Sequence, residues 1–276
     1  MVEKTSVLTK TLLYCALGFV AFGMIAPMLW MLLLSLRQHP ESYGTFGGLF
    51  AAPASIENYT DALSSDAFGK YFLNSTFVAL LVTAGNVIFC LWVGYALARR
   101  NFIGKRWLFG SILGVMMIPQ QVIMIPLYRL MVEFGWINTY YALIIPWLVT
   151  PLGVFLVRQY VLALPAEIED AARIDGAGEW YILWKIVMPL CKPILTVLAL
   201  YVFLSNWNSF LFPFLFTNEE SMRTLPVGLA FYLGKQSIDW GHLMAGASIS
   251  ALPILLMFVF FHKRIIQGLT AGALKE

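Results

Sequence analysis

The sequence predicts an all-α integral membrane protein with about six transmembrane helices and a short cytoplasmic helix between the fourth and the fifth. The composition, the long runs without charge, and the placement of Lys and Arg support this fold class. Hydrophobic residues make up 60% of the 276 residues and charged residues 12%, and the mean hydropathy is +0.77. Soluble domains have about a quarter charged residues, so most of this protein's surface has to face lipid.

Six runs of the chain contain no Asp, Glu, Lys, Arg or His. Each run is about as long as the roughly 20 residues that a helix needs to cross a hydrocarbon core. In lipid only helices and closed barrels satisfy their backbone hydrogen bonds, and barrel strands would be shorter and alternating. We therefore expect six helical spans. The runs are 11–36, 71–98, 107–128, 134–157, 193–218 and 243–261.

The chain reads as a single transmembrane domain over 1–276. The first run, 11–36, is too long for the apolar region of a signal peptide, so we expect an uncleaved span. An extracytoplasmic loop at 37–70 follows, in which Ser55 is placed to cap a short helix. The core spans then occupy 71–262.

The third and fourth runs each contain two prolines, at Pro119, Pro126, Pro146 and Pro151. Proline in a membrane helix kinks it and frees carbonyls, which neighbouring helices or water must satisfy. Two interpretations of these prolines are open: kinks that only help the helices to pack, and a partly hydrated pathway.

Lys and Arg residues set the orientation. Thirteen of them fall in connections on the side of the N-terminus and five on the other side. Cytoplasmic connections carry the excess of positive charge, so both termini are expected in the cytoplasm. The net charge of +3 reflects this bias, and we expect no nucleic-acid partner because no basic patch is interleaved with stacking aromatics in a soluble segment.

An enzyme is not expected. The chain has no G-x-x-x-x-G-K-[ST] phosphate loop. Cys15, Cys90 and Cys191 form no metal-ligand pattern and are interpreted as small buried hydrophobes. We therefore expect neither a metal nor another cofactor.

A proton- or ion-coupled secondary transporter of a small polar solute is the alternative that shares this composition. Such carriers generally place Asp, Glu or His in mid-membrane as relays, and the six runs contain none. This pattern favours a protein whose energy source lies in another chain.

The connection at 163–190 is the most informative segment. Pro165 suits the first position of a helix, where its missing amide hydrogen costs no hydrogen bond. Acidic residues in the following turn interact favourably with the positive end of the helix dipole. Gly176 is predicted to end this helix in the left-handed conformation. A second helix is expected from about Glu179 to Val187, stopping before Pro189.

One face of the first of these helices is suited to a protein partner. Ile168, Ala171, Ala172 and Asp175 share a face by their spacing, and the two alanines leave a low surface that another protein could approach closely. A surface helix that contacts nothing is the other interpretation.

The same segment resembles a known family. Its residues have the EAA---G---------I-LP spacing of permeases from binding-protein-dependent ABC importers. The longer stretches EDAARIDGAGEW and IVMPL are similar to the sugar-importer, MalG-like branch of these permeases. Asp170 stands for the usual Glu and Met188 for the usual Leu, which keeps the charge sign and the apolarity. The motif residues are Asp170, Ala171, Ala172, Gly176, Ile186 and Pro189.

The resemblance extends along most of the chain, and it implies partners. It implies a bacterial inner membrane location, a second permease subunit in a heterodimer, two cytoplasmic ATP-binding subunits, and an extracytoplasmic solute-binding protein. The helix at 165–176 would couple to an ATPase subunit, and the tail at 267–272 would also reach toward the ATPase pair. The coupling residues it implies are Glu169, Asp170, Ala171, Ala172, Asp175 and Gly176.

Candidate substrate contacts lie in the second and fifth runs. Asn206, Trp207 and Asn208 form a polar and aromatic cluster in the middle of the fifth run, and Asn86 lies in the second. Such groups can stack on and hydrogen-bond a sugar ring, whereas hydrogen bonds between helices would use the same side chains. The partner permease can also carry these contacts, and malto-oligosaccharides, trehalose, galactosides, polyols and glycerol phosphate stay open as substrates.

Overall fold

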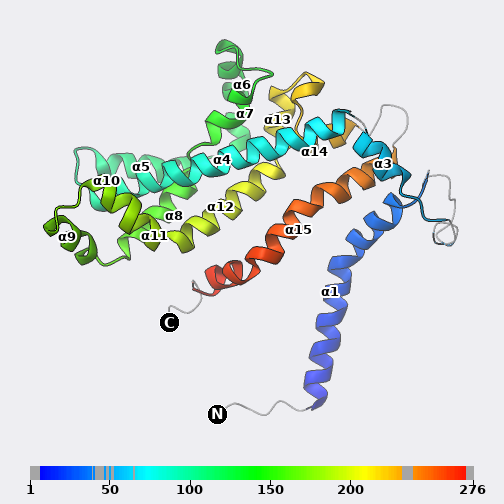
Figure 1. Ribbon diagram of the computed structural model, residues 1–276, viewed down its shortest axis with the longest axis horizontal. Coiled ribbons are helices and arrows are strands. Elements are labelled where there is room, and N and C mark those ends of the chain that lie inside the picture. The colour runs from blue at the N-terminus through cyan, green and yellow to red at the C-terminus, as the bar shows by residue number, and fades with distance from the viewer. Residues whose placement is uncertain are drawn as a thin grey trace. The chain divides into compact units, whose positions relative to one another are not determined.

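The computed structural model describes residues 7–38, 40, 47, 50, 53–64, 66–231 and 239–271, without the side chains of 66 and 262–271. Regular structure in this part of the chain is helical (Figure 1), which confirms the predicted fold class. The chain forms two compact units, which are described in turn. The first comprises Met1–Gly69 with Leu229–Leu252, and the second comprises Lys70–Gly228 with Pro253–Glu276.

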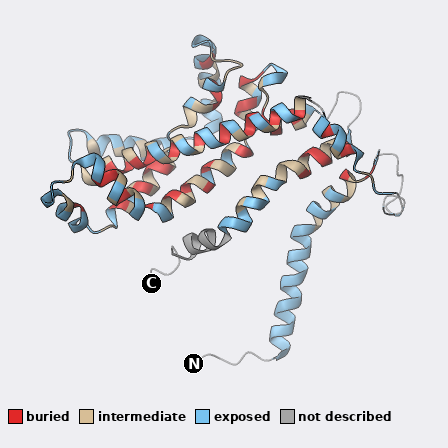
Figure 2. Cartoon of the chain, viewed as in Figure 1, coloured by how far each residue is buried: buried red, intermediate tan, exposed pale blue. Residues whose placement is uncertain are grey.

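The first unit contains α1 (Val7–Ser35), α3 (Glu57–Ser64) and the beginning of α15 (Trp240–Ala271). Most side chains of α1 are exposed (Figure 2), as expected for an apolar helix that meets lipid. The short helix expected after Ser55 is confirmed, and the Ser55 hydroxyl accepts a hydrogen bond from the Glu57 amide at 3.1 Å. Much of the loop predicted at 37–70 lies outside the described residues.

Asn58 anchors α3 to the end of α1. Its side-chain amide donates to the carbonyls of Ser35 at 3.0 Å and Arg37 at 2.8 Å, and Asn58 is only 6% exposed. The Ser35 and Tyr59 hydroxyls are hydrogen-bonded at 2.7 Å. Buried polar side chains thus fix the turn that follows the first span.

The second unit holds most of the helices. Its longest helix, α4 (Asp66–Arg99), begins in the first unit and runs beside α5, α8 and α12 (Figure 1). The helices after α4 are α5 (Lys105–Met116), η2 (Gln120–Ile123), α6 (Met124–Glu133), α7 (Tyr140–Ile144), η3 (Ile145–Trp147), α8 (Pro151–Leu162), α9 (Glu167–Ile174), α10 (Glu179–Tyr181), the π-helix η4 (Ile182–Val187), α11 (Met188–Leu190), α12 (Lys192–Trp207), α13 (Leu211–Phe216), η5 (Glu220–Met222) and α14 (Leu225–Ala230).

Within the part of the chain that the structure describes, four helical segments are long and apolar enough to cross a membrane, and two bent pairs can make a span each. The pairs bend by 98° between Lys105–Met116 and Gln120–Glu133, and by 78° between Glu179–Leu190 and Lys192–Trp207. Pro119 lies at the first bend, in the region where proline was expected to distort the third span. The four unbroken segments are Val7–Ser35, Ala67–Arg99, Tyr140–Leu162 and Trp240–Phe261.

Close packing of α4 against α8 forms the core of the second unit. A Cβ atom added at Gly94 would lie 2.8 Å from Val157 Cγ1, and one at Gly153 would lie 2.7 Å from Cys90 Sγ. Glycine at both contacts lets the two backbones approach, as small residues do between membrane helices. Val157 is fully buried in this contact.

The predicted fifth span, 193–218, is not one helix. The α12 helix ends at Trp207, and a separate short helix begins at Leu211. The amides of Asn206 and Asn208 donate to carbonyls four residues back, at 3.1 and 2.9 Å. Asparagine side chains that bond to nearby backbone disfavour helix continuation, so the polar cluster lies at a helix end and not in mid-helix.

The prediction that a helix stops before Pro189 is also wrong. The chain continues through the π-helix Ile182–Val187 into α11, and Pro189 lies in the first turn of α11. A proline ring clashes with the carbonyl four residues earlier. The wider π-turn shifts this carbonyl pattern and lets the helical path continue.

Candidate functional site

Two regions of the second unit hold the candidate functional residues. We call residues 163–190 the α9 segment. We call the space between α5, η3, α8 and α12 the α12 cavity. The two regions differ in charge and in the way their side chains are held.

Gly176 ends α9 as predicted. Its φ angle is 83°, in the left-handed region that favours glycine. The Ala177 amide donates to the Ala172 carbonyl at 2.9 Å and the Gly176 amide to the Arg173 carbonyl at 3.0 Å. These two bonds are the Schellman arrangement that closes a helix, so the direction of the chain after α9 is fixed.

The beginning of α9 differs from the prediction. Pro165 was expected at the first helical position, but the helix begins at Glu167 and Ala166 is its cap. If Pro165 were the first helical residue, the Leu164 carbonyl would accept the first intrahelical bond. That carbonyl instead accepts a hydrogen bond from Arg99 Nη2 at 2.7 Å, which delays the helix.

Glu169 points inward. The residue is 3% exposed, and its carboxylate accepts hydrogen bonds from Arg99 Nε at 2.6 Å and from the Tyr95 hydroxyl at 3.0 Å. Arg173 Nη2 lies 3.4 Å from the same carboxylate. The resemblance implied that Glu169 couples to a partner, and the structure places it against α4 within this chain.

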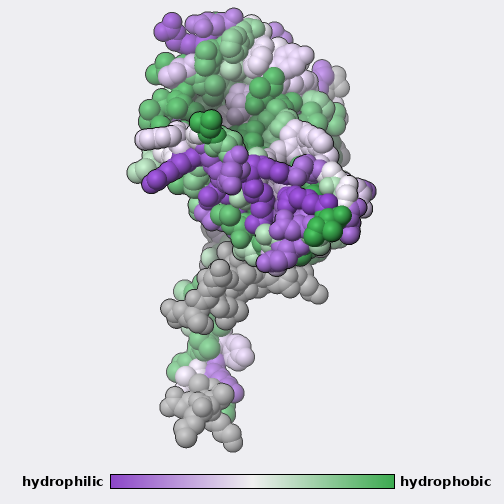
Figure 3. Space-filling view, turned by 90° about the vertical axis from the view of Figure 1, so that its left-hand side faces the viewer, coloured by the Kyte–Doolittle hydropathy of each residue, from purple (hydrophilic) through white to green (hydrophobic). Residues whose placement is uncertain are grey.

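The outward face of α9 contains most of the other expected residues. Ile168 and Ala171 are exposed, as are Asp170 and Asp175, whereas Ala172 is half-buried against the core. Figure 3 views the molecule from the α9 side and shows a band of hydrophilic side chains across this face. Ile174 is 87% exposed and was not predicted, although a large apolar residue in the last turn of a charged helix is a signal for contact.

A second layer of contacts holds α10 beside α9. Arg173 forms ion pairs with Asp170 at 2.7 Å and with Glu179 at 3.3 Å, and Arg100 pairs with Glu179. The α9 segment therefore carries a charged network in which Glu169 is buried, while Arg173, Glu179 and Arg100 remain partly exposed.

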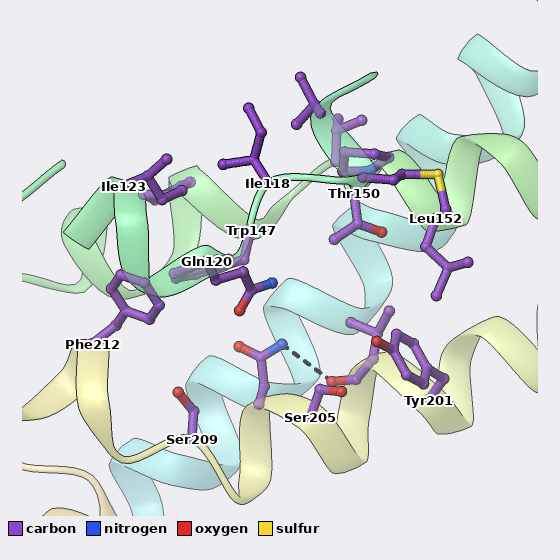
Figure 4. A pocket seen from close by; sticks show the side chains of 17 residues that line it. Ile118, Gln120, Ile123, Trp147, Thr150, Leu152, Tyr201, Ser205, Ser209 and Phe212 are labelled. Atoms are coloured by element: carbon purple, nitrogen blue, oxygen red, sulfur yellow. Dashed lines mark hydrogen bonds between the residues drawn. The ribbon is translucent and has the colours of Figure 1, made fainter. Parts of the chain in front are cut away.

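The α12 cavity has a volume of about 610 Å³ and is lined by 17 uncharged residues. Gln120, Ser205 and Ser209 bring polar side chains to it, and Thr150 faces them from the start of α8 (Figure 4). Its aromatic residues are Trp147, Tyr201 and Phe212. Hydrogen-bonding groups beside aromatic rings, without a charge, suit a neutral polar ligand.

Of the four residues predicted to line a substrate pathway, the structure places one at the cavity. Asn206 lines the cavity. Trp207 is 3% exposed and stacks on Phe203 with ring centroids 5.7 Å apart. Asn208 is exposed and bonded to its own helix. Asn86 is fully buried and donates to the Trp147 carbonyl at 3.0 Å, which supports the interhelical alternative for this residue.

The sequence offered a signal for the cavity residues that were missed. Tyr201 and Ser205 are spaced by four, which places them on one face of α12, and Ser209 follows just beyond the end of this helix. Gln120 follows Pro119, so the break of the third span brings its side chain to the cavity.

Asparagines also tie together the end of the second unit opposite α9. The Asn74 side-chain amide donates to the carbonyls of Ser221 and Arg223, both at 2.9 Å, and Asn74 Oδ1 accepts from the Tyr140 hydroxyl at 2.6 Å. Asn138, with φ 57°, accepts from the Asn218 amide at 2.6 Å. Both asparagines therefore hold loops in place.

Comparison with known proteins gives matches along the whole chain. Residues 90–270 match the family described as "Binding-protein-dependent transport system inner membrane component". The chain is 36% identical over 278 residues to the arabinooligosaccharides transport system permease protein AraQ of Halalkalibacterium halodurans, with 100% of both chains covered. It is 36% identical to the trehalose/maltose transport system permease protein MalG of Thermococcus litoralis, with 99% of both covered.

Solved structures share the fold. A chain of a bacterial ABC transporter involved in the import of the acidic polysaccharide alginate matches with a TM-score of 0.83 at 22% identity, covering 95% of this chain and 98% of that chain. A chain of the alginate transporter in complex with an alginate pentasaccharide-bound periplasmic protein matches with a TM-score of 0.56 at 13% identity, covering 94% and 96%.

Proposed function

This chain belongs to the family of inner membrane components of binding-protein-dependent transport systems, and we propose that it is a permease subunit of an ATP-driven importer of a neutral sugar or oligosaccharide. The motif spacing around Gly176 predicted this family, and the match over residues 90–270 confirms it. In the proposed complex the chain pairs with a second permease. Two ATP-binding subunits and an extracytoplasmic solute-binding protein complete it, and ATP is hydrolysed outside this chain.

The observation that best supports the proposal is the two-sided construction of α9. One side is fixed to the chain by Glu169 and closed by Gly176. The other side exposes Ile168, Ala171 and Ile174, a small apolar surface among charged residues. A fixed helix with an exposed apolar edge is suited to insert into a groove of another protein, and here that protein would be the ATPase.

The α12 cavity supports a neutral sugar as the substrate. Sugars offer hydroxyl groups for side chains such as Gln120, Ser205 and Asn206, and aliphatic ring faces for aromatic residues such as Tyr201. The relatives named above transport arabinooligosaccharides and trehalose or maltose, which supports the oligosaccharide class. The lining has no cation for a phosphorylated ligand.

Reconstitution distinguishes this proposal from an ion-coupled carrier. The chain, its partner permease, the ATPase and the binding protein are inserted in liposomes, and uptake of labelled oligosaccharide is measured with ATP or with a proton gradient. We expect uptake only with ATP and binding protein. Uptake by this chain alone on a proton gradient would support the alternative instead.

Orientation is tested separately. If both termini lie in the cytoplasm, we expect reporter fusions to report 163–190 inside and 45–65 and 219–240 outside. A fusion that places 163–190 outside would remove α9 from the reach of any cytoplasmic ATPase and would overturn the proposal. Parts of 45–65 and 219–240 lie outside the described residues.

A further inference from the structure

We propose that the Arg99–Glu169 ion pair joins α9 and α4 into one rigid lever that carries movement of the docking helix to the wall of the α12 cavity. This inference rests on the proposed function, because it assumes that an ATPase moves α9. Glu169 and Arg99 are then positioning residues, and their role is separate from that of the exposed docking face.

The ion pair is largely shielded from solvent, with Glu169 buried and Arg99 partly buried. The Arg99 side chain is 14% exposed and that of Glu169 is 4% exposed, with 2.6 Å between Nε and Oε1. A buried ion pair commonly stabilises a fold no more than apolar residues of similar size would. Its value lies in fixed geometry, since removal of the Glu169 charge takes from Arg99 its ion-pair partner, and removal of Arg99 leaves Glu169 with only the more exposed Arg173.

Arg99 binds the α9 segment at two places. Its Nε atom donates to Glu169 and its Nη2 atom donates to the Leu164 carbonyl, so one planar guanidinium spans the turn that leads into the helix. Tyr95, four residues earlier on the same face of α4, donates to the other oxygen of Glu169. Three bonds with fixed directions leave α9 little freedom to tilt relative to α4.

The α4 helix leads from this contact to the cavity. It continues without a break over 34 residues. Asn86 in this helix donates to the Trp147 carbonyl at 3.0 Å and to Thr150 Oγ1 at 3.3 Å. Trp147 and Thr150 both line the α12 cavity. A displacement of the Arg99 end of α4 is therefore passed by direct hydrogen bonds to the cavity wall.

The test compares two neighbouring carboxyl groups of α9. Glu169→Gln keeps the shape and removes the inward charge, whereas Asp170→Asn makes the same change on a side chain that is 64% exposed. Each variant is studied in the full complex in liposomes. The measurements are capture of the ATPase, hydrolysis stimulated by the binding protein, and sugar taken up per ATP hydrolysed.

We expect Glu169→Gln to retain the ATPase and its hydrolysis but to lower uptake per ATP by about tenfold. Asp170→Asn should change capture and uptake together, with uptake per ATP unchanged. The double variant Glu169→Gln with Arg99→Gln should be no worse than either single change, since the two residues act as a unit. Normal uptake per ATP in Glu169→Gln overturns the inference.

If Glu169→Gln does not assemble into the complex, a second variant tests the inference. Arg99→Lys keeps the charge but cannot reach both Glu169 and the Leu164 carbonyl with a planar fork. We expect this variant to assemble with a partial loss of uptake per ATP, and an unchanged ratio would overturn the lever. If the wild-type chain captures no ATPase, the proposed function fails, which is a different result.

Discussion

The α9 segment and the α12 cavity hold their polar side chains in opposite ways. Around α9, charged groups are bound to residues far away in sequence, as Glu169 is to Arg99. In the cavity, and among the described residues, the Asn206 side chain bonds only to its own helix, and the side chains of Gln120, Ser205 and Ser209 have no hydrogen-bond partner. Fixed charges keep α9 in place, and the neutral side chains of the cavity keep hydrogen-bonding groups available for a ligand.

The largest expected effect comes from Gly176→Val. A side chain at φ 83° costs about 1–2 kcal/mol and a β-branched residue fits this region poorly, so the end of α9 must turn away. We expect the chain to insert in the membrane but to lose uptake and ATPase capture. Transport at the wild-type rate would show that the α9 segment does not need a fixed direction.

Introducing a bulky side chain on either side of α9 is expected to have two different effects. Ala171 is exposed and Ala172 is half-buried against the core. Ala171→Trp should prevent ATPase capture and leave the thermal stability of the chain unchanged, while Ala172→Trp should displace the helix and lower stability as well. Capture and melting temperature are measured for both. Equal stability losses would contradict the assigned faces.

Filling the α12 cavity should disturb transport without disturbing docking. Ser205→Trp places an indole in the space of about 610 Å³. We expect ATPase capture to be normal and sugar uptake to fall by about tenfold. Uptake that is unchanged would show that the substrate passes elsewhere.

The smallest expected effect comes from alanine substitutions at two neighbouring asparagines. Asn206 lines the cavity, whereas Asn208 is exposed outside it. Asn206→Ala should weaken apparent sugar affinity several-fold, by about 1 kcal/mol for one hydrogen bond, and Asn208→Ala should stay near the wild type. Loss of assembly in Asn206→Ala would favour packing as its role.

The sequence predicted local features well because neighbouring residues determine them. The end of α9 follows from glycine at 176, and the membrane class follows from runs such as 71–98. The inward turn of Glu169 could not be predicted, because it depends on Arg99, 70 residues away. Likewise the cavity depends on the bend after Met116, which brings Gln120 to α12.

Cross-linking from the exposed tip of α9 tests the central claim most directly. Ile174→Cys is introduced with Cys15→Ser, since Cys15 is exposed on the apolar helix α1, where burial was wrongly predicted, while Cys90 and Cys191 are buried as predicted. The assembled complex is treated with a short thiol-reactive cross-linker and resolved by mass. The account predicts a cross-link from residue 174 to the ATPase subunit. Labelling of this cysteine by a membrane-impermeant reagent from outside the cell, with no cross-link to the ATPase, would contradict it.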